Sequence, residues 1–374
     1  MRIVHVSDCY LPRTGGIESQ VSDLAAHQVA AGHEVHVLTA TLGEAGERGG
    51  VVDVVDGVHV HRLGARMPFA LPVTPAGPRL LRAAYRTIVP DAVHVHAGVV
   101  SPFAFDGARI AMAMNLPVAI TWHCMLDGVV GSLRAAARLA GWEHAAAALS
   151  AVSGAAARRV EEVFEVPVSV VPNGMDLDVW TPAGLMAEAR SGPVHLVSTM
   201  RLAPRKRAVP LLEMVGAAVD RLPAGSVRMT LIGSGPEQRR VETQLRRSHL
   251  EQVVTLAGRL TRDQVRTAYA EADVFLAPAE LEAFGIAALE ARAAGLAVVA
   301  RRGTGIEEFV EDGLDGLLAV DDRDMTEAVI RLVQDEGLLE GIRSHNRAVR
   351  PAFDWDVVLR AAASEYSRAA GLIR

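Results

Sequence analysis

The sequence predicts an α/β protein made of two doubly wound, Rossmann-like domains that face each other across a cleft. Strand-like apolar runs alternate with helical patterns, the alternation pauses over residues 172–192, and a second series of the same kind follows. Strands that alternate with helices favour right-handed βαβ units and mainly parallel sheets. The length of 374 residues also suits two domains of ordinary size.

The first domain is expected at residues 1–180. Its strand-like runs cover residues 3–7, 34–39, 58–63, 92–96, 118–122 and 168–171. Helical patterns include residues 17–31, which Gly32 closes, and residues 133–141. A last helix at about 353–374 is expected to return to this domain.

The second domain is expected at residues 193–352, after a turn signal at Pro172-Asn173-Gly174 and a linker-like stretch at 181–192. Its strand-like runs cover residues 194–199, 228–232, 253–256, 274–277, 297–300 and 317–320, and Gly295 closes a helix over 285–294. Such domains carry ligand groups at the carboxyl ends of their strands, and a cleft between two of them suits a small molecule.

Composition excludes several classes of protein. A net charge of −6 argues against bulk nucleic-acid binding. Cys9 and Cys124 are the only cysteines, which gives neither a disulfide framework nor a metal site and suits a reducing cytoplasm. The chain enters a strand at once, so no signal peptide is expected, and no apolar run is long enough to span a membrane.

Lys206 is the only lysine among 38 basic residues, and it lies in the densest short basic cluster. Arg201 is expected to end a strand, and Lys206 to open the following helix. Two cations and helix-terminal N–H groups at the carboxyl end of a strand can bind a diphosphate without a metal. The alternative is that neighbouring acidic residues bind this basic loop.

A second motif follows the strand-like run 274–277. Gly285 allows the backbone to approach a ligand closely, and the N–H groups of Phe284, Gly285 and Ile286 are expected at the positive end of a helix dipole. Glu282 precedes this helix, and Glu290 lies about one and a half turns into it. One carboxylate can therefore reach a sugar and the other a ribose, although Glu290 alone is typical of an exposed helix residue.

Paired glycines follow the first strand, at Gly15-Gly16, where a mobile backbone can approach a phosphate. Many βα turns contain such a pair, so the signal is weak alone. The stricter G-x-G-x-x-G pattern of dinucleotide-binding proteins is absent here, and also at Gly233-Ser234-Gly235-Pro236 in the second domain.

Three histidines stand near strand ends. His123 directly follows the run 118–122. It is expected to point toward the same crevice as the cations. His94 and His96 share one face of their strand, a spacing that could hold a metal ion, but no carboxylate obviously joins them. Structural histidines are the favoured interpretation of this pair.

Residues 62–86 form an Arg-rich segment with several prolines. The pattern predicts a long loop leading into a basic helix and contains Arg62, Arg66, Arg79, Arg82 and Arg86. A solvated surface is the favoured interpretation, because arginine is common throughout the chain. The functional alternative is contact with an acceptor or with an anionic membrane.

Together these motifs resemble the family-4 retaining glycosyltransferases of the GT-B fold, along nearly the whole chain. The pieces are Gly15-Gly16-Ile17-Glu18, Gly32-His33-Glu34-Val35, Val171-Pro172-Asn173-Gly174-Met175-Asp176, Arg201 with Lys206, Gly233-Ser234-Gly235-Pro236, Gly258, Glu282 with Glu290, and Gly305-Ile306-Glu307-Glu308. Four positions depart mildly from the family pattern, namely Ala279, Ala283, Arg292 and Thr304, and they leave the sugar pocket open.

The resemblance implies a role for each candidate residue. Arg201 and Lys206 would neutralise the nucleotide diphosphate, Glu282 would hold hydroxyl groups of the donor sugar, and Glu290 would hold the ribose. His123 resembles the histidine near the reactive end of the sugar. The implied donor-binding set is Gly16, Arg201, Lys206, Glu282, Phe284, Gly285, Ile286 and Glu290, the implied catalytic set is His123, Arg201, Lys206 and Glu282, and Gly15 and Gly16 form the acceptor or phosphate loop.

The implied reaction is a metal-independent, retaining transfer of a hexose or N-acetylhexosamine from a nucleotide-diphosphate sugar to an acceptor hydroxyl. A UDP-sugar is the favoured donor and GDP-mannose the alternative, with a small molecule, a glycan or a lipid as acceptor. No metal and no other cofactor is expected, and the expected location is the cytoplasm, with weak peripheral membrane contact.

Two alternative functions remain. A nucleotide-sugar epimerase of the same fold would form product without an acceptor. A non-catalytic sugar-binding protein would bind sugar without nucleotide.

Overall fold

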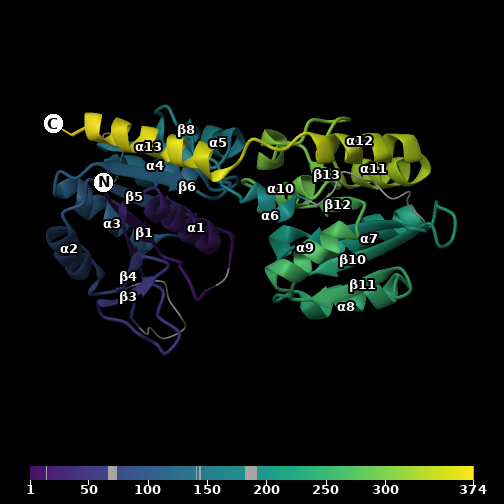
Figure 1. Cartoon of the computed structure of the whole chain (residues 1–374), viewed down its shortest axis with the longest axis horizontal. Coiled ribbons are helices and arrows are strands. Elements are labelled where there is room, and N and C mark those ends of the chain that lie inside the picture. The colour runs from purple at the N-terminus through teal and green to yellow at the C-terminus, as the bar shows by residue number, and fades with distance from the viewer. Residues whose placement is uncertain (14, 66–73, 140, 143–144, 182–191, 374) are drawn as a thin grey trace. The chain divides into compact units, whose positions relative to one another are not determined.

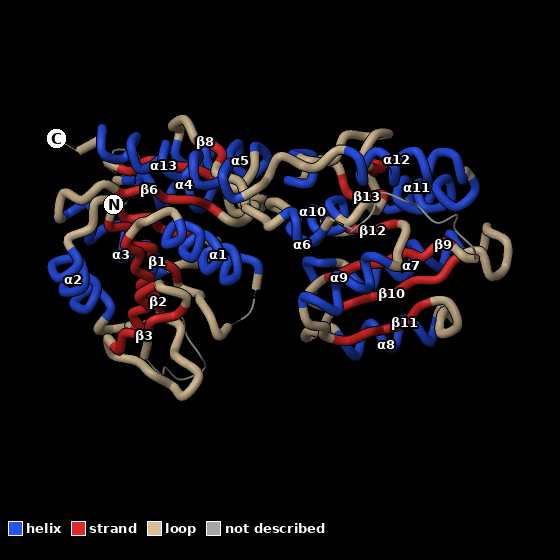
Figure 2. The backbone as a smooth tube through the Cα atoms, in the orientation of Figure 1, coloured by secondary structure: helices blue, strands red, loops and turns tan. Residues whose placement is uncertain are grey.

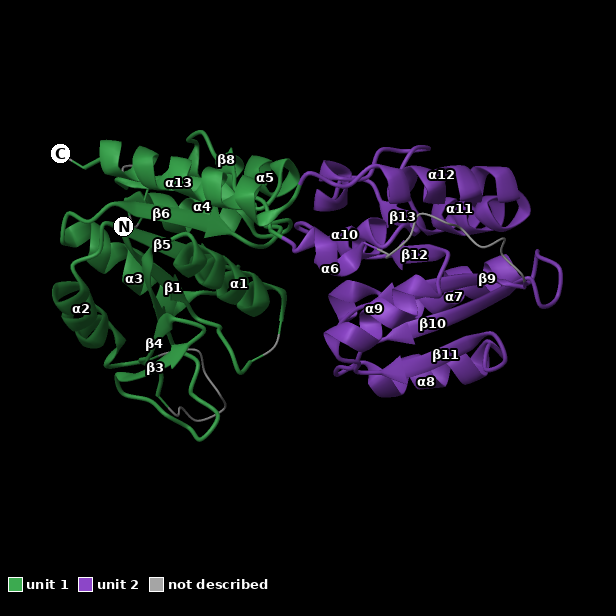
Figure 3. Ribbon diagram, in the orientation of Figure 1, with its two compact units in different colours: residues 1–174, 353–374 green, residues 175–352 purple. Residues whose placement is uncertain are grey.

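The computed structural model describes residues 1–13, 15–65, 74–139, 141–142, 145–181 and 192–373. The chain divides into two compact units, residues 1–174 with 353–374 and residues 175–352 (Figure 3). Each unit contains one sheet with helices packed on it (Figures 1 and 2), which confirms the expected doubly wound α/β class. Arg66 and most of the linker-like stretch lie outside the described residues.

The first unit is built on mainly parallel strands. They are β1 (Arg2–Ser7), β2 (Glu34–Thr39), β3 (Val51–Val55), β4 (Val58–Arg62), β5 (Ala92–Ala97), β6 (Val118–Trp122), β7 (Ala147–Ala151) and β8 (Ser169–Val170). Its helices are α1 (Gly16–Ala30), α2 (Gly77–Ile88), α3 (Pro102–Ala113), α4 (Val130–Leu139), α5 (Gly154–Phe164) and α13 (Trp355–Gly371). The strand order is β3-β4-β2-β1-β5-β6-β7-β8, so the order reverses direction between β1 and β5.

The C-terminal helix α13 belongs to this first unit, as expected. It packs over β5, β6 and β7, where the strands present the small side chains of Ala92, Ala119 and Ala148. Small residues let the helix approach the sheet closely enough to bury Tyr366. Asp354 caps the helix by accepting a hydrogen bond from the backbone N–H of Val357 (2.9 Å).

The second unit repeats the plan. Its strands are β9 (Val194–Thr199), β10 (Val227–Ile232), β11 (Val254–Gly258), β12 (Val274–Ala277), β13 (Ala297–Arg301) and β14 (Gly316–Ala319). Its α-helices are α6 (Leu177–Trp180), α7 (Ala208–Val219), α8 (Gln238–Arg247), α9 (Arg262–Ala270), α10 (Ile286–Ala293), α11 (Asp322–Gln334) and α12 (Glu336–Ala348). All pairings are parallel, in the order β11-β10-β9-β12-β13-β14, and the direction reverses between β9 and β12.

Burial explains why these segments form central strands. Strand β13 is an apolar run that is buried at all but its last position, as is typical of a strand covered on both faces. Strand β5 is buried at every position although it alternates valine with His94 and His96, so both of its faces are covered as well. Strand β3 differs, because Val51, Val52, Val54 and Val55 are all exposed. It pairs antiparallel with β4 at the sheet edge, and the sequence pattern did not predict it.

Candidate functional site

The cationic loop and the Glu282 loop leave neighbouring strands of the second unit. Strands β9 and β12 are adjacent and parallel, so the loops that follow them start from the same edge of the sheet. The ammonium Nζ of Lys206 forms an ion pair with Oε2 of Glu282. This edge lies where the strand order reverses, which is the position where open α/β sheets bind ligands.

Lys206 does not open the following helix, so that expectation is wrong. Residues Pro204–Lys206 form a short 3-10 turn, and α7 begins only at Ala208. The cause is Arg207, whose backbone lies in the left-handed region at φ 61° and separates the turn from the helix. Strand β9 also ends at Thr199, so Arg201 lies in the loop rather than at the strand's last position.

The basic cluster divides into structural and available cations. The guanidinium of Arg207 contacts both carboxylate oxygens of Asp322 (3.1 and 2.6 Å) and also Glu280 (2.6 Å). Arg301 contacts the same two acids (3.3 and 3.6 Å). Arg201, in contrast, is exposed and forms no ion pair with any residue that the structure describes. Its charge is therefore available to an anion.

Two glycines support the loop that carries Arg201. A Cβ atom on Gly233 would lie 1.8 Å from the carbonyl oxygen of Met200, and one on Gly235 would lie 2.4 Å from that of Leu202. The backbone N–H of Leu202 donates to the carbonyl of Ser234 (3.0 Å). The Gly-Ser-Gly-Pro segment thus holds the cationic loop by close backbone packing, which only glycine permits.

The Glu282 loop is supported in the same way. A Cβ atom on Gly305 would lie 2.0 Å from the carbonyl oxygen of Ala283, and the N–H of Gly305 donates to the carbonyl of Glu282 (2.8 Å). Gly285 then adopts φ 95° and caps α10, which begins at Ile286. The backbone N–H groups at this helix N-terminus therefore follow directly after the acid that Lys206 contacts.

Helix α10 carries Glu290 in its second turn, on a partly exposed position. Tyr269 lies nearby: its hydroxyl donates to the carbonyl of Ala287 (3.4 Å), and burial raises its pKa well above the usual value, with a contribution from the Glu290 charge. On the same helix lies Arg292, one of the four positions noted as departing from the pattern of the resembled family. It is buried and donates two hydrogen bonds to Asp315 (3.0 and 2.7 Å).

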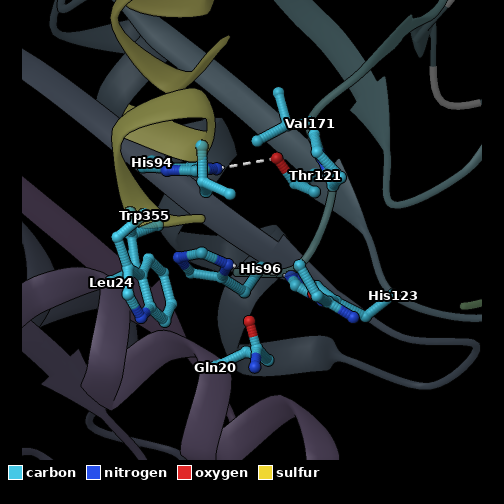
Figure 4. Close-up of a pocket in the computed structure, with 11 residues that line it drawn as sticks. Gln20, Leu24, His94, His96, Thr121, His123, Val171 and Trp355 are labelled. Atoms are coloured by element: carbon cyan, nitrogen blue, oxygen red, sulfur yellow. Dashed lines mark hydrogen bonds between the residues drawn. The ribbon is translucent and has the colours of Figure 1, made fainter. Parts of the chain in front are cut away.

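The three histidines noted near strand ends in the first unit lie around a small cavity. His123 follows β6, and His94 and His96 come from β5; all three line a cavity of about 20 Å³, together with Gln20 (Figure 4). Gln20 also fixes the Pro172-Asn173-Gly174 turn, because its amide exchanges two hydrogen bonds with the backbone of Gly174 (2.9 and 3.0 Å). A volume of this size holds one water molecule.

Hydrogen bonds favour the structural interpretation of the buried histidines. The ring nitrogens of His5, His94 and His96 lie close enough together to suggest a metal site. Each of these rings, however, has hydrogen-bond partners at both nitrogens. Burial lowers the pKa of His5 to about 4 and the pKa values of His94 and His96 well below the usual value, so the three rings are neutral at pH 7.

The glycine pair after β1 lies at the start of α1, which Gly15 precedes and Gly16 opens. The carboxylate of Glu18 folds back over this turn, because a Cβ atom on Gly15 would lie 2.3 Å from its Oε2. Glu18 also pairs with Arg13 (3.1 Å). A carboxylate thus occupies the position at the N-terminus of α1.

Asp8 is a polar residue that sequence reasoning missed. It follows β1 and accepts hydrogen bonds from the backbone N–H groups of Phe103 (3.1 Å) and Ala104 (3.0 Å) at the start of α3. Burial raises the pKa of its carboxyl to about 6, although these two hydrogen bonds oppose the shift. Its position directly after the first strand was the available signal.

Each unit matches a described family. Residues 14–179 match the family described as "Glycosyltransferase Family 4", and residues 193–335 match "Glycosyl transferases group 1". The loops that carry Arg201, Lys206 and Glu282 lie in the second of these matches.

Curated relatives are similar along almost the whole chain. The phosphatidyl-myo-inositol mannosyltransferase of Mycolicibacterium smegmatis is 30% identical over 372 residues, which covers 96% of this chain and 91% of the relative. A subunit of the phosphatidylinositol N-acetylglucosaminyltransferase of Arabidopsis thaliana is 27% identical over 382 residues, which covers 99% of this chain and 82% of the relative.

Solved structures show the same fold. Anabaena Alr3699/HepE in complex with UDP and glucose superposes with a TM-score of 0.76 at 20% identity, covering 98% of this chain and 99% of that one. A glycosyltransferase from Rickettsia africae superposes with a TM-score of 0.74 at 15% identity, covering 98% of both chains. From its domains and its relatives, the chain belongs to the family-4 glycosyltransferases of the GT-B fold.

Proposed function

We propose that the chain transfers a hexose or N-acetylhexosamine, with retention of anomeric configuration, from a nucleotide-diphosphate sugar to an acceptor hydroxyl. The observation that carries the proposal is the charge arrangement in the second unit. Arg201 is exposed without an ion-pair partner among the described residues, and Lys206, on the same loop, pairs with Glu282. Both cations precede α7 on a loop next to the one that leads into α10, which suits a diphosphate.

Charge stabilisation of the leaving group is the main role of these residues. Negative charge develops on the diphosphate as the bond to the sugar breaks, and fixed cations and helix-terminal amides stabilise it most at that point. Lys206 supplies a compact ammonium, Arg201 supplies a second cation, and the amides around Gly285 add the helix dipole. Glu282, released from Lys206 when the diphosphate binds, is free to accept hydrogen bonds from sugar hydroxyls.

The bond changes balance without a further reactant. The bond between the anomeric carbon and the phosphate oxygen breaks, and its electron pair remains on the phosphate. The acceptor oxygen forms the new bond to the anomeric carbon from the same face, and its proton passes to the departing phosphate. No protein nucleophile is required, and the cations perform the charge neutralisation that a metal performs in other enzymes.

The donor we favour is a UDP-sugar, with GDP-mannose as the alternative. The solved HepE structure, which contains UDP and glucose, supports the first choice. Two relatives from Mycobacterium tuberculosis, which are named as GDP-mannose-dependent mannosyltransferases, support the second. A thermal-shift panel of UDP, GDP and their sugars separates them, because a preferred ligand stabilises the folded state by linkage. Equal shifts with all nucleotides would contradict a specific donor site.

A lipid acceptor is the choice that the relatives favour. Several of them are named for phosphatidylinositol substrates. In the first unit, α2 presents Arg79, Arg82 and Arg86 on exposed positions three and four residues apart, with no acid in its first turn. None of these arginines forms an ion pair with a described residue, so the face is suited to anionic headgroups.

Membrane contact is therefore proposed to be peripheral, at the inner face of the membrane. No helix within the described residues is long and apolar enough to cross a bilayer. At low salt the protein should co-sediment with vesicles that mix phosphatidylcholine with an anionic lipid, because surface arginines are attracted to anionic headgroups. Changing Arg79, Arg82 and Arg86 together to Gln should abolish binding, whereas equal binding to neutral vesicles would contradict the electrostatic contact.

Product analysis tests the proposed reaction itself. Incubation with the stabilising sugar nucleotide and a phosphatidylinositol acceptor should give a glycosylated lipid with the donor's anomeric configuration, measured by NMR of the product. An altered sugar nucleotide formed without acceptor would instead identify an epimerase, and an inverted product would overturn the retaining mechanism.

A further inference from the structure

His123 is the outer end of a buried hydrogen-bond chain in the first unit. Its Nε2 lies 3.0 Å from Nδ1 of His96, and Nε2 of His96 lies 2.9 Å from Nδ1 of His5. His5 then contacts the side-chain oxygen of Gln28 through its own Nε2 (2.7 Å). These residues come from β1, α1, β5 and the end of β6, so the chain of contacts runs across the sheet.

The chain continues from Gln28 through helix α13 and back to the sheet. The amide nitrogen of Gln28 donates to the hydroxyl of Tyr366 (2.8 Å), which lies 3.0 Å from Nδ1 of His94. Nε2 of His94 lies 2.7 Å from the hydroxyl of Thr121. The last contacts join Thr121 to the hydroxyl of Ser150 (2.8 Å) and Ser150 to the carbonyl of Ile120 (3.3 Å).

The direction of this chain follows from its acceptor-only groups. The carbonyl of Ile120 can only accept, so Ser150 donates to it, Thr121 donates to Ser150, and His94 donates to Thr121. His94 must then accept from Tyr366, whose hydroxyl accepts from Gln28. The oxygen of Gln28 also only accepts, so Nε2 of His5 carries a proton. The two ends of the hydrogen-bond chain therefore assign the same direction of proton donation along it.

The same logic assigns the proton of each remaining ring. A neutral imidazole has one N–H and one acceptor nitrogen. Because Nε2 of His5 donates, its Nδ1 accepts from Nε2 of His96, and Nδ1 of His96 accepts from Nε2 of His123. The rings are neutral because burial lowers the pKa of His5 and of His123 to about 4. His123 is thus left with an unprotonated Nδ1.

We infer that this relay, the hydrogen-bonded series from His123 to Ser150, fixes His123 as a hydrogen-bond acceptor for a hydroxyl group of the bound sugar substrate, with His96 as the positioning residue. Nδ1 of His123 has no hydrogen-bond partner among the residues that the structure describes, and the side chain is partly exposed. A hydroxyl can donate to this atom. The inference rests on the proposed function only for the identity of the ligand, and not for the tautomer.

The relay matters because an unsupported histidine could present either nitrogen as donor. A neutral imidazole in water exchanges between tautomers, and a site that meets a hydroxyl with the wrong tautomer loses the hydrogen bond. The backbone N–H of His123 also donates to the carbonyl of Ala97 (2.9 Å), which anchors the residue to β5. The geometry is therefore fixed before any ligand binds.

NMR of the 15N-histidine-labelled full chain tests the tautomer without any substrate. Long-range proton–nitrogen correlations distinguish protonated from unprotonated ring nitrogens, and comparison with H123N assigns the signals. We expect His123 at pH 7 to carry its proton on Nε2. A proton on Nδ1 would mean that the chain runs in the opposite direction, and it would overturn the inference.

Variants of His96 test its positioning role. H96F removes the acceptor for His123, so the Nδ1-protonated form of His123 should appear. H96Q retains a side-chain acceptor and donor, and should keep the tautomer of the parent. The control is H59F, which removes a histidine of β4 that lies outside the relay. An unchanged His123 tautomer in folded H96F would overturn the role of His96.

Kinetics then connect the relay to transfer. We expect H96F to lower kcat/KM for the sugar nucleotide about tenfold, while H96Q and H59F stay within about threefold of the parent. A loss shared equally by H96F and H59F would indicate a structural effect and contradict positioning. If the tautomers behave as expected but no variant or parent transfers sugar, the proposed function fails and the relay stands. If the enzyme is active but His123 carries its proton on Nδ1, the relay is wrong and the proposed function stands.

Discussion

The two units place polar groups at their sheet edges in opposite ways. In the first unit His123 follows a strand end and leads into a buried series of neutral rings, an amide and hydroxyls, each joined to the next by a hydrogen bond. In the second unit the corresponding edge carries full charges, with Arg201 exposed and Lys206 paired to Glu282.

The difference indicates which kind of ligand group, neutral or anionic, each unit can bind. A neutral hydrogen-bonded network fixes the orientation of His123, whose Nδ1 can meet a neutral hydroxyl without adding charge. Cations suit an anion: Arg201 is exposed without an ion-pair partner among the described residues, and Lys206 can exchange Glu282 for a phosphate. A sugar nucleotide contains both neutral sugar hydroxyls and an anionic diphosphate. The comparison therefore supports the proposal that the first unit contacts the sugar and the second unit binds the diphosphate.

Removing the lysine should have the largest effect. We expect K206A to lower kcat about a hundredfold to a thousandfold, the loss typical of one preorganised contact to developing negative charge. K206R should recover little, because a planar guanidinium does not replace a compact ammonium. The control is R205A, an exposed neighbour in the same turn. Turnover of K206A within about twofold of the parent would break the comparison, since one lost transition-state contact typically costs at least tenfold.

Disturbing the glycine that supports the Glu282 loop should come next. G305A places a Cβ atom 2.0 Å from the carbonyl oxygen of Ala283, so the two backbones must separate. We expect a loss of about 3 kcal/mol in the free energy of unfolding, measured by urea denaturation. The control is G341A in α12, where a Cβ atom meets no neighbour within 4 Å. Similar stabilities of the two variants would contradict the close packing.

Breaking a buried ion pair should have a moderate effect on the second unit. Arg292 and Asp315 are 6% and 5% exposed, so R292M leaves a buried carboxylate without its main partner. We expect a loss of about 2–3 kcal/mol in the free energy of unfolding, somewhat below the usual range because His345 still faces Asp315 at 3.3 Å. R302M breaks the exposed pair with Asp312 and should cost about 0.5 kcal/mol or less. Equal losses in the two variants would contradict the importance of burial.

Acid should destabilise the first unit gradually, through the protonation of its buried histidines. His5 has a pKa of about 4 when folded and 6.5 when unfolded, so the unfolded state binds more protons in this range and stability falls as the pH drops from 6.5 to 4. Each such histidine contributes up to about 1.4 kcal/mol per pH unit. Asp8, with its pKa raised to about 6, opposes one of them below pH 6.

Thermal unfolding across the range from neutral pH down to the folded pKa of His5, about 4, measures this slope. H5Q should reduce it, because one buried titratable ring is lost. Equal slopes in the parent and H5Q would contradict the neutral, buried state of the relay.

The fold and the charged residues of the candidate site could be predicted from the sequence. The local backbone geometry of the loops could not. Strand-like runs that alternate with helical patterns predict the central strands, and Lys206 and Glu282 are both expected in segments that follow such runs. The expected helix start is wrong, because nothing in the sequence marks the left-handed backbone of Arg207. Strand β3 escapes prediction because its valines are exposed on an edge and show no alternation.

The histidine relay lies beyond sequence reasoning for a different reason. The spacing of His94 and His96 indicates a structural pair, but their partners come from β1, α1 and α13, and Tyr366 lies 272 residues from His94. Tertiary packing alone brings these groups into hydrogen-bond distance. The roles of Glu290, Gly15 and Gly16 stay predictions, since they depend on a bound ligand.

The most direct test of the central claim compares binding of UDP and of uridine, by calorimetry, to the parent and to K206A. The account predicts that UDP binds the parent well and uridine only weakly, because the diphosphate meets Lys206 and Arg201. It also predicts that K206A loses most of the difference between the two ligands. Equal affinities of UDP and uridine for the parent, or an unchanged difference in K206A, would contradict it.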